Sequence, residues 1–164
     1  MSKKGKSGGQ GTPATVALAK AEIGFTLHPY EHDADASAYG EEAADALGLP
    51  YERIFKTLVA EVDSGLAVAV VPVSGRLDLK AFAAALDSKR ATMAEAARVE
   101  RVTGYVVGGI SPLGQRKRLP TVVDASALGF PTVYFSAGRR GLQIETAPAG
   151  LVELTGAVTA PITK

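Results

Sequence analysis

Hydrophobic and polar residues alternate in some stretches of the chain and recur at helical spacing in others. Two β-rich runs, 54–62 and 66–73, flank Asp63-Ser64-Gly65, and this pattern predicts a hairpin. Further strands are predicted at 25–30, 121–123, 132–135 and 142–146. Helices are predicted at 13–23, 40–47, 79–86, 94–102 and 148–154. Short turns join many of these elements, so we expect an α+β fold with a mixed sheet.

Residues at the ends of the predicted helices support these boundaries. Pro13 suits a first helical turn, and Asp78 can cap the helix that follows it. Gly48 and Gly104 are plausible C-terminal stops. The glycines and arginines of 138–141 predict a tight turn between two strands.

Composition limits the classes of site that the chain can hold. The 164 residues suit one domain, and hydrophobic residues make up 46% but aromatic residues only 6%. The core must therefore consist mainly of aliphatic side chains. The absence of Cys excludes disulfides, thiolate metal sites and a cysteine nucleophile. Residues 1–12 are rich in Gly, Ser and Lys and are predicted to be a disordered tail, with a single domain over 13–164.

The net charge of +1 depends on that tail. Without its three lysines, 15 of the 18 cations remain against 17 anions, so a general nucleic-acid coat is not expected. Positive charge is instead local, at 89–90, 116–118 and 139–140. No apolar run is long enough to span a membrane, and the N-terminus lacks the apolar segment of a secretory signal. We therefore expect a cytoplasmic protein without membrane association.

The segment 108–120 carries the strongest chemical signal. It contains three glycines, two prolines and three consecutive cations. Exposed backbone N–H groups beside Arg and Lys suit an anionic ligand, most often phosphate. The segment matches neither the P-loop nor the dinucleotide fingerprint, so ATP and NAD are not expected as ligands.

Other polar residues allow more than one interpretation. Lys56 shares a strand face with Ile54 and Leu58, so it either meets an anion or extends to water. His28 and His32 are separated by Pro29, and their spacing is weak evidence for a metal. Tyr30 is either a strand residue with a polar tip or a ligand contact. The conspicuous serines, none in a Gly-x-Ser-x-Gly motif, are Ser111, Ser126 and Ser136.

Several segments in order resemble the YbaK family of trans-editing aminoacyl-tRNA deacylases. The motifs that carry this resemblance are 56–58 (Lys-Thr-Leu), 104–105, 108–120 and 136–142, with similar segments at 28–33 and 68–80. The match extends from about Thr15 to Leu154. The resemblance implies a YbaK-type fold, in which a curved mixed sheet forms an incomplete barrel flanked by helices.

The resemblance also implies hydrolysis of mischarged cysteinyl-tRNA(Pro), and of cysteinyl-tRNA(Cys) as a further substrate. In this family the substrate's own thiol is thought to attack the aminoacyl ester, so no metal, cofactor or protein nucleophile is expected. The implied partners are the aminoacyl-tRNA and prolyl-tRNA synthetase. The oligomeric state is not predicted.

The catalytic residues implied by the resemblance are Tyr30, Lys56, Gly108, Gly109 and Ser136. Substrate-binding residues are expected at Ser111, Pro112, Gly114, Arg118, Gly138, Arg139 and Gln143. Gln143 departs from the family, which often has an acidic residue at that position. Two alternatives therefore stay open: a catalytically weak module that binds tRNA acceptor ends, and an alanyl-tRNA(Pro) deacylase.

Overall fold

The computed structural model describes residues 11–36 and 38–164. Its strands are β2 (Thr26–Pro29), β3 (Phe55–Val62), β4 (Gly65–Pro72), β5 (Thr92–Met93), β6 (Thr121–Asp124), β7 (Val133–Arg139), β8 (Leu142–Thr146) and β9 (Val158–Ala160). Its helices are α1 (Pro13–Lys20), α2 (Tyr39–Leu47), α3 (Leu79–Ala85), α4 (Ala96–Thr103), α5 (Pro148–Thr155) and the short 3-10 helix η2 (Ala125–Gly129).

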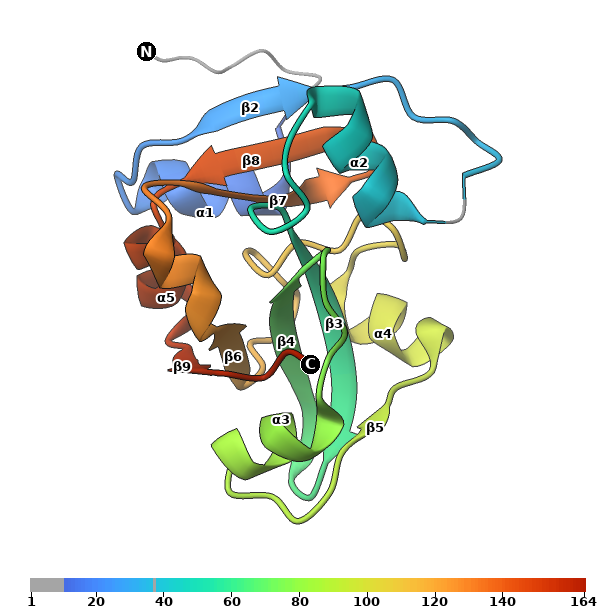
Figure 1. The fold of residues 1–164 in the computed structure, drawn as a ribbon, viewed down its shortest axis with the longest axis vertical. Helices are drawn as coiled ribbons and strands as arrows, with labels where there is room; N and C mark the ends of the chain where they lie inside the picture. Colours follow the sequence, from blue (N-terminus) through green and yellow to red (C-terminus); the bar gives the residue numbers. More distant parts are fainter. Residues whose placement is uncertain (1–10, 37) are drawn as a thin grey trace.

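The described strands form two sheets, one in the order β2-β8-β7 and one in the order β5-β3-β4-β6-β9. In Figure 1 the first sheet runs across the top, and β3 and β4 descend beneath it. The β4–β6 and β6–β9 pairs are parallel and the other pairs are antiparallel. The predicted α+β class and mixed pairing are confirmed, and the sheets do not close into a barrel.

Most predicted elements lie close to their expected positions. The hairpin of β3 and β4 is confirmed, as are the cap of α3 by Asp78 and the left-handed stops at Gly48 and Gly104. The first helix was predicted to reach Ile23 but ends at Lys20, because Glu22 adopts a φ of 60° that a helix cannot continue through. β5 and β9 were not predicted, since two or three residues are too few to show a periodicity.

The aliphatic core surrounds β4, which is buried from Leu66 to Pro72. Val68 and Val70 pack in one cluster with Phe135, while Val71 packs in a second cluster with Phe82. Both faces of this strand are therefore covered, and its neighbour β3 is held in place along its whole length. Across residues 11–36 and 38–164, every helix falls short of the length and apolarity that a membrane crossing requires.

Thr12 joins the start of the folded chain to β7. The tail was predicted over residues 1–12. Residues 1–10 lie outside the described residues, whereas Thr12 belongs to the folded part of the chain. Thr12 is buried, caps α1 through a capping box with Thr15, and donates a 2.6 Å hydrogen bond to the carbonyl of Ala137. This cap was not predicted, because Thr12 is a single residue at the end of a segment rich in Gly, Ser and Lys.

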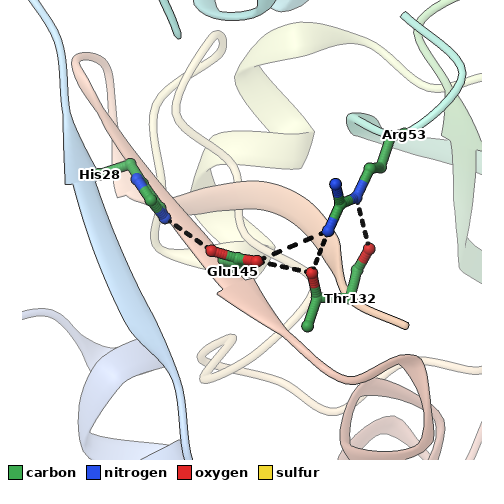
Figure 2. A network of polar contacts seen from close by, with 4 residues as sticks. All are labelled: His28, Arg53, Thr132 and Glu145. Carbon is green, nitrogen blue, oxygen red and sulfur yellow. Dashed lines mark hydrogen bonds and ion pairs between the residues drawn. The ribbon is translucent and has the colours of Figure 1, made fainter. Parts of the chain in front are cut away.

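A polar network connects four segments of the chain, at β2, at β8, just before β7 and just before β3 (Figure 2). Glu145 on β8 accepts hydrogen bonds from His28 on β2 at 2.8 Å and from Thr132 at 2.6 Å. Arg53, just before β3, donates to Thr132 and lies 3.6 Å from the Glu145 carboxylate. The Thr132 hydrogen bond lowers the pKa of Glu145; burial opposes this shift, and contacts with His28 and Tyr134 reinforce it.

We expect Glu145→Gln to lower the free energy of unfolding by about 1 kcal/mol at pH 7, because the charge-assisted hydrogen bonds weaken. The carboxylate's ordinary pKa is 4.5 and its pKa in the folded protein is lower. Its contribution is therefore fully present above that ordinary value and is lost as the pH falls through the lowered pKa. Urea unfolding at about pH 7 and about pH 3 checks this. Glu153→Gln, on an exposed part of α5, is the control. An equal loss at both pH values would contradict the prediction.

Candidate active site

A cavity of about 430 Å³, called the β3 cavity below, opens beside β3. Its walls come from strands β3, β5, β7 and β8, from helices α2 and α4, and from the loop at Gly108. The lining residues are Ala38, Tyr39, Gly40, Glu41, Ile54, Phe55, Lys56, Thr57, Leu58, Val59, Met93, Ala94, Ala96, Val99, Val107, Gly108, Ile110, Ser136 and Gln143. Most of these side chains are apolar, so the few polar groups among them stand out.

The cavity lies where one edge of β3 has no strand beside it. β4 pairs with β3 from Phe55 to Val62, but β5 pairs only with Ala60 and Glu61. The Val59 carbonyl accepts a hydrogen bond from Ala94 N–H, on the side away from β4. Because main-chain direction alternates along a strand, the N–H and C=O groups of Thr57 face that same edge, between the β5 pairs and the bridge of Ile54 to Tyr134. The cavity wall therefore includes main-chain donors and acceptors.

Lys56 lines the β3 cavity and carries an ammonium group. It is half-buried on β3, opposite Val71 of β4. Within residues 11–36 and 38–164, no carboxylate oxygen lies within 4 Å of its Nζ. Removing a charge from water without a partner is costly, so this position favours an anionic or strongly polar ligand.

Two residues of the cavity lining carry a buried side-chain oxygen that lacks a partner among the described residues. These oxygens are Thr57 Oγ1 and Gln143 Oε1; Thr163 Oγ1, near the C-terminus, is a third such atom. Gln143 is 7% exposed, so water does not easily replace the missing partner. Most buried polar atoms in proteins are hydrogen-bonded. Two exceptions on residues of one cavity make this region a candidate for binding a polar ligand.

Tyr30 lies outside the cavity lining, beside Gln143. Burial raises the pKa of its hydroxyl, the Gly141 main chain lowers it, the charge of Glu42 raises it, and the Gln143 amide lowers it. Gln143 is thus contacted on one side by Tyr30 and faces the cavity on the other. This arrangement makes Tyr30 a support for the site and places no part of it in the cavity wall.

Ser136 lies directly opposite Gln143 in the register of β7 and β8. Its hydroxyl oxygen accepts a 3.1 Å hydrogen bond from Gly138 N–H, at a β-bulge between Ser136 and Arg139. The hydroxyl proton can still be donated to a ligand. The bulge thus fixes the Ser136 side chain at the cavity.

The two adjacent glycines have different positions. Gly108 lines the cavity, and a Cβ there would lie 2.7 Å from Arg140 Nε and 2.9 Å from the Tyr39 ring. Gly109 is outside the lining, and its Cβ would lie 2.7 Å from Arg139 Cα. Gly108 therefore allows close approach at the cavity, whereas Gly109 allows the loop to pack on the β7–β8 turn.

The other predicted substrate-binding residues lie outside the cavity lining: Ser111, Pro112, Gly114, Arg118, Gly138 and Arg139. Ser111 is 0% exposed and accepts from Leu113 N–H, within its own loop. A Cβ on Gly114 would lie 2.5 Å from the Pro13 main chain, so this glycine packs against the start of α1. Arg118 and Arg139 are exposed. The structure thus brings Lys56, Gly108, Ser136 and Gln143 together around one cavity.

Sequence reasoning missed several lining residues. Thr57 stands in the Lys-Thr-Leu motif, and its neighbour Lys56 could have pointed to it. Tyr39 and Glu41 reach the cavity because α2 packs through Ala43 and Ala44 in one cluster with Ile54 and Tyr134, and no local pattern signals this. His28 and His32 are hydrogen-bonded to Glu145 and Glu42, respectively. Among the residues described, no group of three or more His, Asp or Glu is arranged to hold a metal.

The chain is similar in sequence to known proteins. Residues 33–154 match the protein-family model described as "Aminoacyl-tRNA editing domain". The chain is 42% identical over 124 residues to "Putative Cys-tRNA(Pro)/Cys-tRNA(Cys) deacylase EbsC" of Enterococcus faecalis (strain ATCC 700802 / V583), covering 75% of this chain and 76% of that protein. It is 28% identical over 145 residues to uncharacterized protein YwhH of Bacillus subtilis (strain 168), covering 85% and 92% of the two chains.

A solved structure shares the fold. It is described as a "putative trans-editing enzyme for prolyl tRNA synthetase", and it matches with a TM-score of 0.82 and 27% sequence identity. The match covers 93% of this chain and 95% of that chain. The expected YbaK-type resemblance is confirmed: by the family match over residues 33–154, this chain belongs to the aminoacyl-tRNA editing domain family.

Proposed function

We propose that this protein is a trans-editing deacylase that removes cysteine from cysteinyl-tRNA(Pro), and also from cysteinyl-tRNA(Cys). The observation that carries the proposal is the β3 cavity, whose lining includes Lys56 and the two residues with an unpartnered buried oxygen, Thr57 and Gln143. A volume of about 430 Å³ lies within the range of small-ligand sites and suits the aminoacylated 3′ end of a tRNA. The name of the Enterococcus faecalis relative supports this choice of substrate.

Four polar side chains of the cavity lining have a counterpart on this substrate. Lys56 binds the phosphate or hydroxyl groups of the terminal adenosine and orients the ester. Gln143 Oε1 and Thr57 Oγ1 accept hydrogen bonds from the cysteine α-ammonium, which satisfies both oxygens. Ser136 donates its hydroxyl proton to the ester region. Leu58, together with the other apolar wall residues, limits the access of water to the reacting atoms.

The reaction follows from holding the substrate in one conformation. The cysteine sulfur attacks the ester carbonyl carbon, so that a carbon–sulfur bond forms and the bond to the ribose oxygen breaks. The thiol proton ends on that ribose oxygen, and cysteine leaves as a cyclic thioester that water later opens. The protein contributes mainly position and polar stabilisation, which can supply several orders of magnitude in rate.

The proposal extends to the partner and the place of action. With 15 cations against 17 anions outside the first 12 residues, the protein lacks the charge excess of an independent tRNA binder. We therefore infer that prolyl-tRNA synthetase delivers the mischarged tRNA. The reaction then takes place in the cytoplasm, where that synthetase charges tRNA.

Lys56→Ala should lower kcat/KM for cysteinyl-tRNA(Pro) by about 100-fold, because it removes the ammonium that orients the ester. The measurement is loss of the labelled amino acid from tRNA. Lys80→Ala, at an exposed position on α3, is the matched control and should retain wild-type activity. Full activity in Lys56→Ala would contradict the mechanism.

The proposed mechanism also predicts which amino acids the protein removes from tRNA(Pro). Alanyl-tRNA(Pro) and seryl-tRNA(Pro) lack the thiol and should be cleaved far more slowly than cysteinyl-tRNA(Pro). Equal cleavage of the alanyl substrate would favour an alanyl-tRNA(Pro) deacylase. Salt-dependent tRNA binding without ester cleavage would instead favour an acceptor-end binding module, a possibility that the uncharged Gln143 keeps open.

Gln143→Leu should raise KM for cysteinyl-tRNA(Pro) by about tenfold, because the α-ammonium loses one buried acceptor. The same variant should cleave N-acetylcysteinyl-tRNA(Pro) like the wild type, because that substrate carries no ammonium. The ratio of kcat/KM for the two substrates measures the effect. An equal loss on both substrates would show that Gln143 does not read the amine.

A further inference from the structure

Charged side chains hold both polar groups of Val107, next to Gly108 in the cavity wall. Glu100 Oε2, on α4, accepts a 2.8 Å hydrogen bond from Val107 N–H. Arg140, in the turn between β7 and β8, donates from Nε at 3.0 Å and from Nη2 to the Val107 carbonyl. Two elements far apart in the sequence thus fix one residue of the loop.

The loop around Val107 is a tight turn with a defined orientation of its central peptide. Gly109 N–H donates a 2.9 Å hydrogen bond to the Val106 carbonyl, which closes a four-residue turn. Gly108, the third residue, has a φ of 90°, as a type II turn requires. A turn of type I differs mainly by rotation of the peptide between the second and third residues. The Val107–Gly108 peptide therefore has an alternative orientation that must be excluded.

Arg140 selects between these two orientations. The C=O and N–H groups of a trans peptide point in opposite directions. With the Val107 carbonyl directed at Arg140, the Gly108 N–H is directed to the opposite side of the peptide. Within the described part of the chain, no hydrogen bond uses that N–H. Because Gly108 lines the β3 cavity, its amide is available to a ligand there.

Arg140 is itself held in one position. Its guanidinium lies 4.6 Å from the centre of the Tyr39 ring, a cation–π contact. A Cβ on Gly108 would lie within 3 Å of both Arg140 and Tyr39, so the stacked pair packs directly on the glycine. The planar fork of Arg places two donors on one oxygen, which an ammonium on a flexible stem cannot reproduce.

We propose that Arg140 and Glu100 are positioning residues that fix the Val107–Gly108 peptide, so that Gly108 N–H donates to the ester oxygen as negative charge develops on it. This inference rests on the proposed deacylase function. A rotated peptide would turn the Val107 carbonyl toward that oxygen, and two negative oxygens would repel each other. Neither Arg140 nor Glu100 lines the cavity, so each acts through the loop.

The activity test compares Arg140→Met with Arg76→Met, an exposed arginine before α3. Arg140→Met should lower kcat for cysteinyl-tRNA(Pro) by about 10- to 100-fold, because a single main-chain donor is misplaced. KM should change by less than about twofold, since Gly108 N–H acts mainly on the developing charge. Arg76→Met should match the wild type. A raised KM with a weaker salt dependence would make Arg140 a phosphate ligand and overturn the proposal.

The hydrogen bond from Val107 N–H to Glu100 allows a rescue test. Glu100→Gln keeps an oxygen that accepts from Val107 N–H and should retain most of the wild-type kcat. Glu100→Leu removes the acceptor at similar volume and should lower kcat as Arg140→Met does. Equal kcat values in the two Glu100 variants would contradict the role of Glu100. Thermal unfolding shows whether each variant folds. If one Glu100 variant fails to fold, the kcat of the other is compared with that of the wild type.

A structural readout needs no tRNA. In protein labelled with ¹³C and ¹⁵N, the Val107 carbonyl and Gly108 amide signals should shift in Arg140→Met and stay unchanged in Arg76→Met. Unshifted signals would overturn the proposed contact. If the wild type cleaves no aminoacyl-tRNA, the proposed function fails while this readout still tests the contact. If the signals shift but kcat is unchanged, only the positioning role fails.

Discussion

The neighbours of β3 change along one of its edges, and the β3 cavity depends on this change. Ile54, just before the strand, forms a bridge to Tyr134 on β7, whereas Ala60 and Glu61 pair with β5. The two neighbours belong to different sheets and do not meet. The stretch between them keeps its pairing with β4 on the other side. A well-supported strand thus borders a cavity, and its side chains hold their positions without a ligand.

The polar groups of the site follow from this arrangement. Lys56 and Thr57 are neighbours on β3, while Ser136 and Gln143 are paired across β7 and β8. Two rigid hairpins therefore supply these four side chains, and the Gly108 loop supplies main chain. Sites on strands are held more closely than sites on free loops. This fits a reaction in which the protein mainly holds the substrate in one conformation.

Much of the fold was predictable, because long elements repeat a clear pattern. The hairpin of β3 and β4 and the strand 142–146 were predicted within one or two residues. The division into two sheets was not, because β6 and β7 are joined by the short helix η2 and still pair in different sheets. Strand pairing over long sequence distances leaves no local signal.

The site was predictable where motifs carried it and not where packing decided it. Lys56, Gly108, Ser136 and Gln143 were predicted and line the cavity, but Ser111 and Gly114 in the same glycine-rich segment pack elsewhere. Glycines required by packing and glycines required by a ligand look alike in a sequence. Glu100 and Arg140 were not predicted because their shared target, Val107, is neither polar nor conspicuous.

The shortness of β5 has a consequence of its own. The N–H and C=O groups of Thr57 have no strand partner on this edge because β5 stops pairing at Ala60. If β5 continued to pair past Met93 as far as Thr57, those groups would be used in sheet hydrogen bonds, without any change to the side chains of β3. Lengthening β5 beyond Met93, toward α4, would therefore close this edge, whereas an insertion before Thr92 would extend the pairing away from the cavity, toward Val62. Strand length, a property that no single residue encodes, decides whether the fold has a place for its substrate.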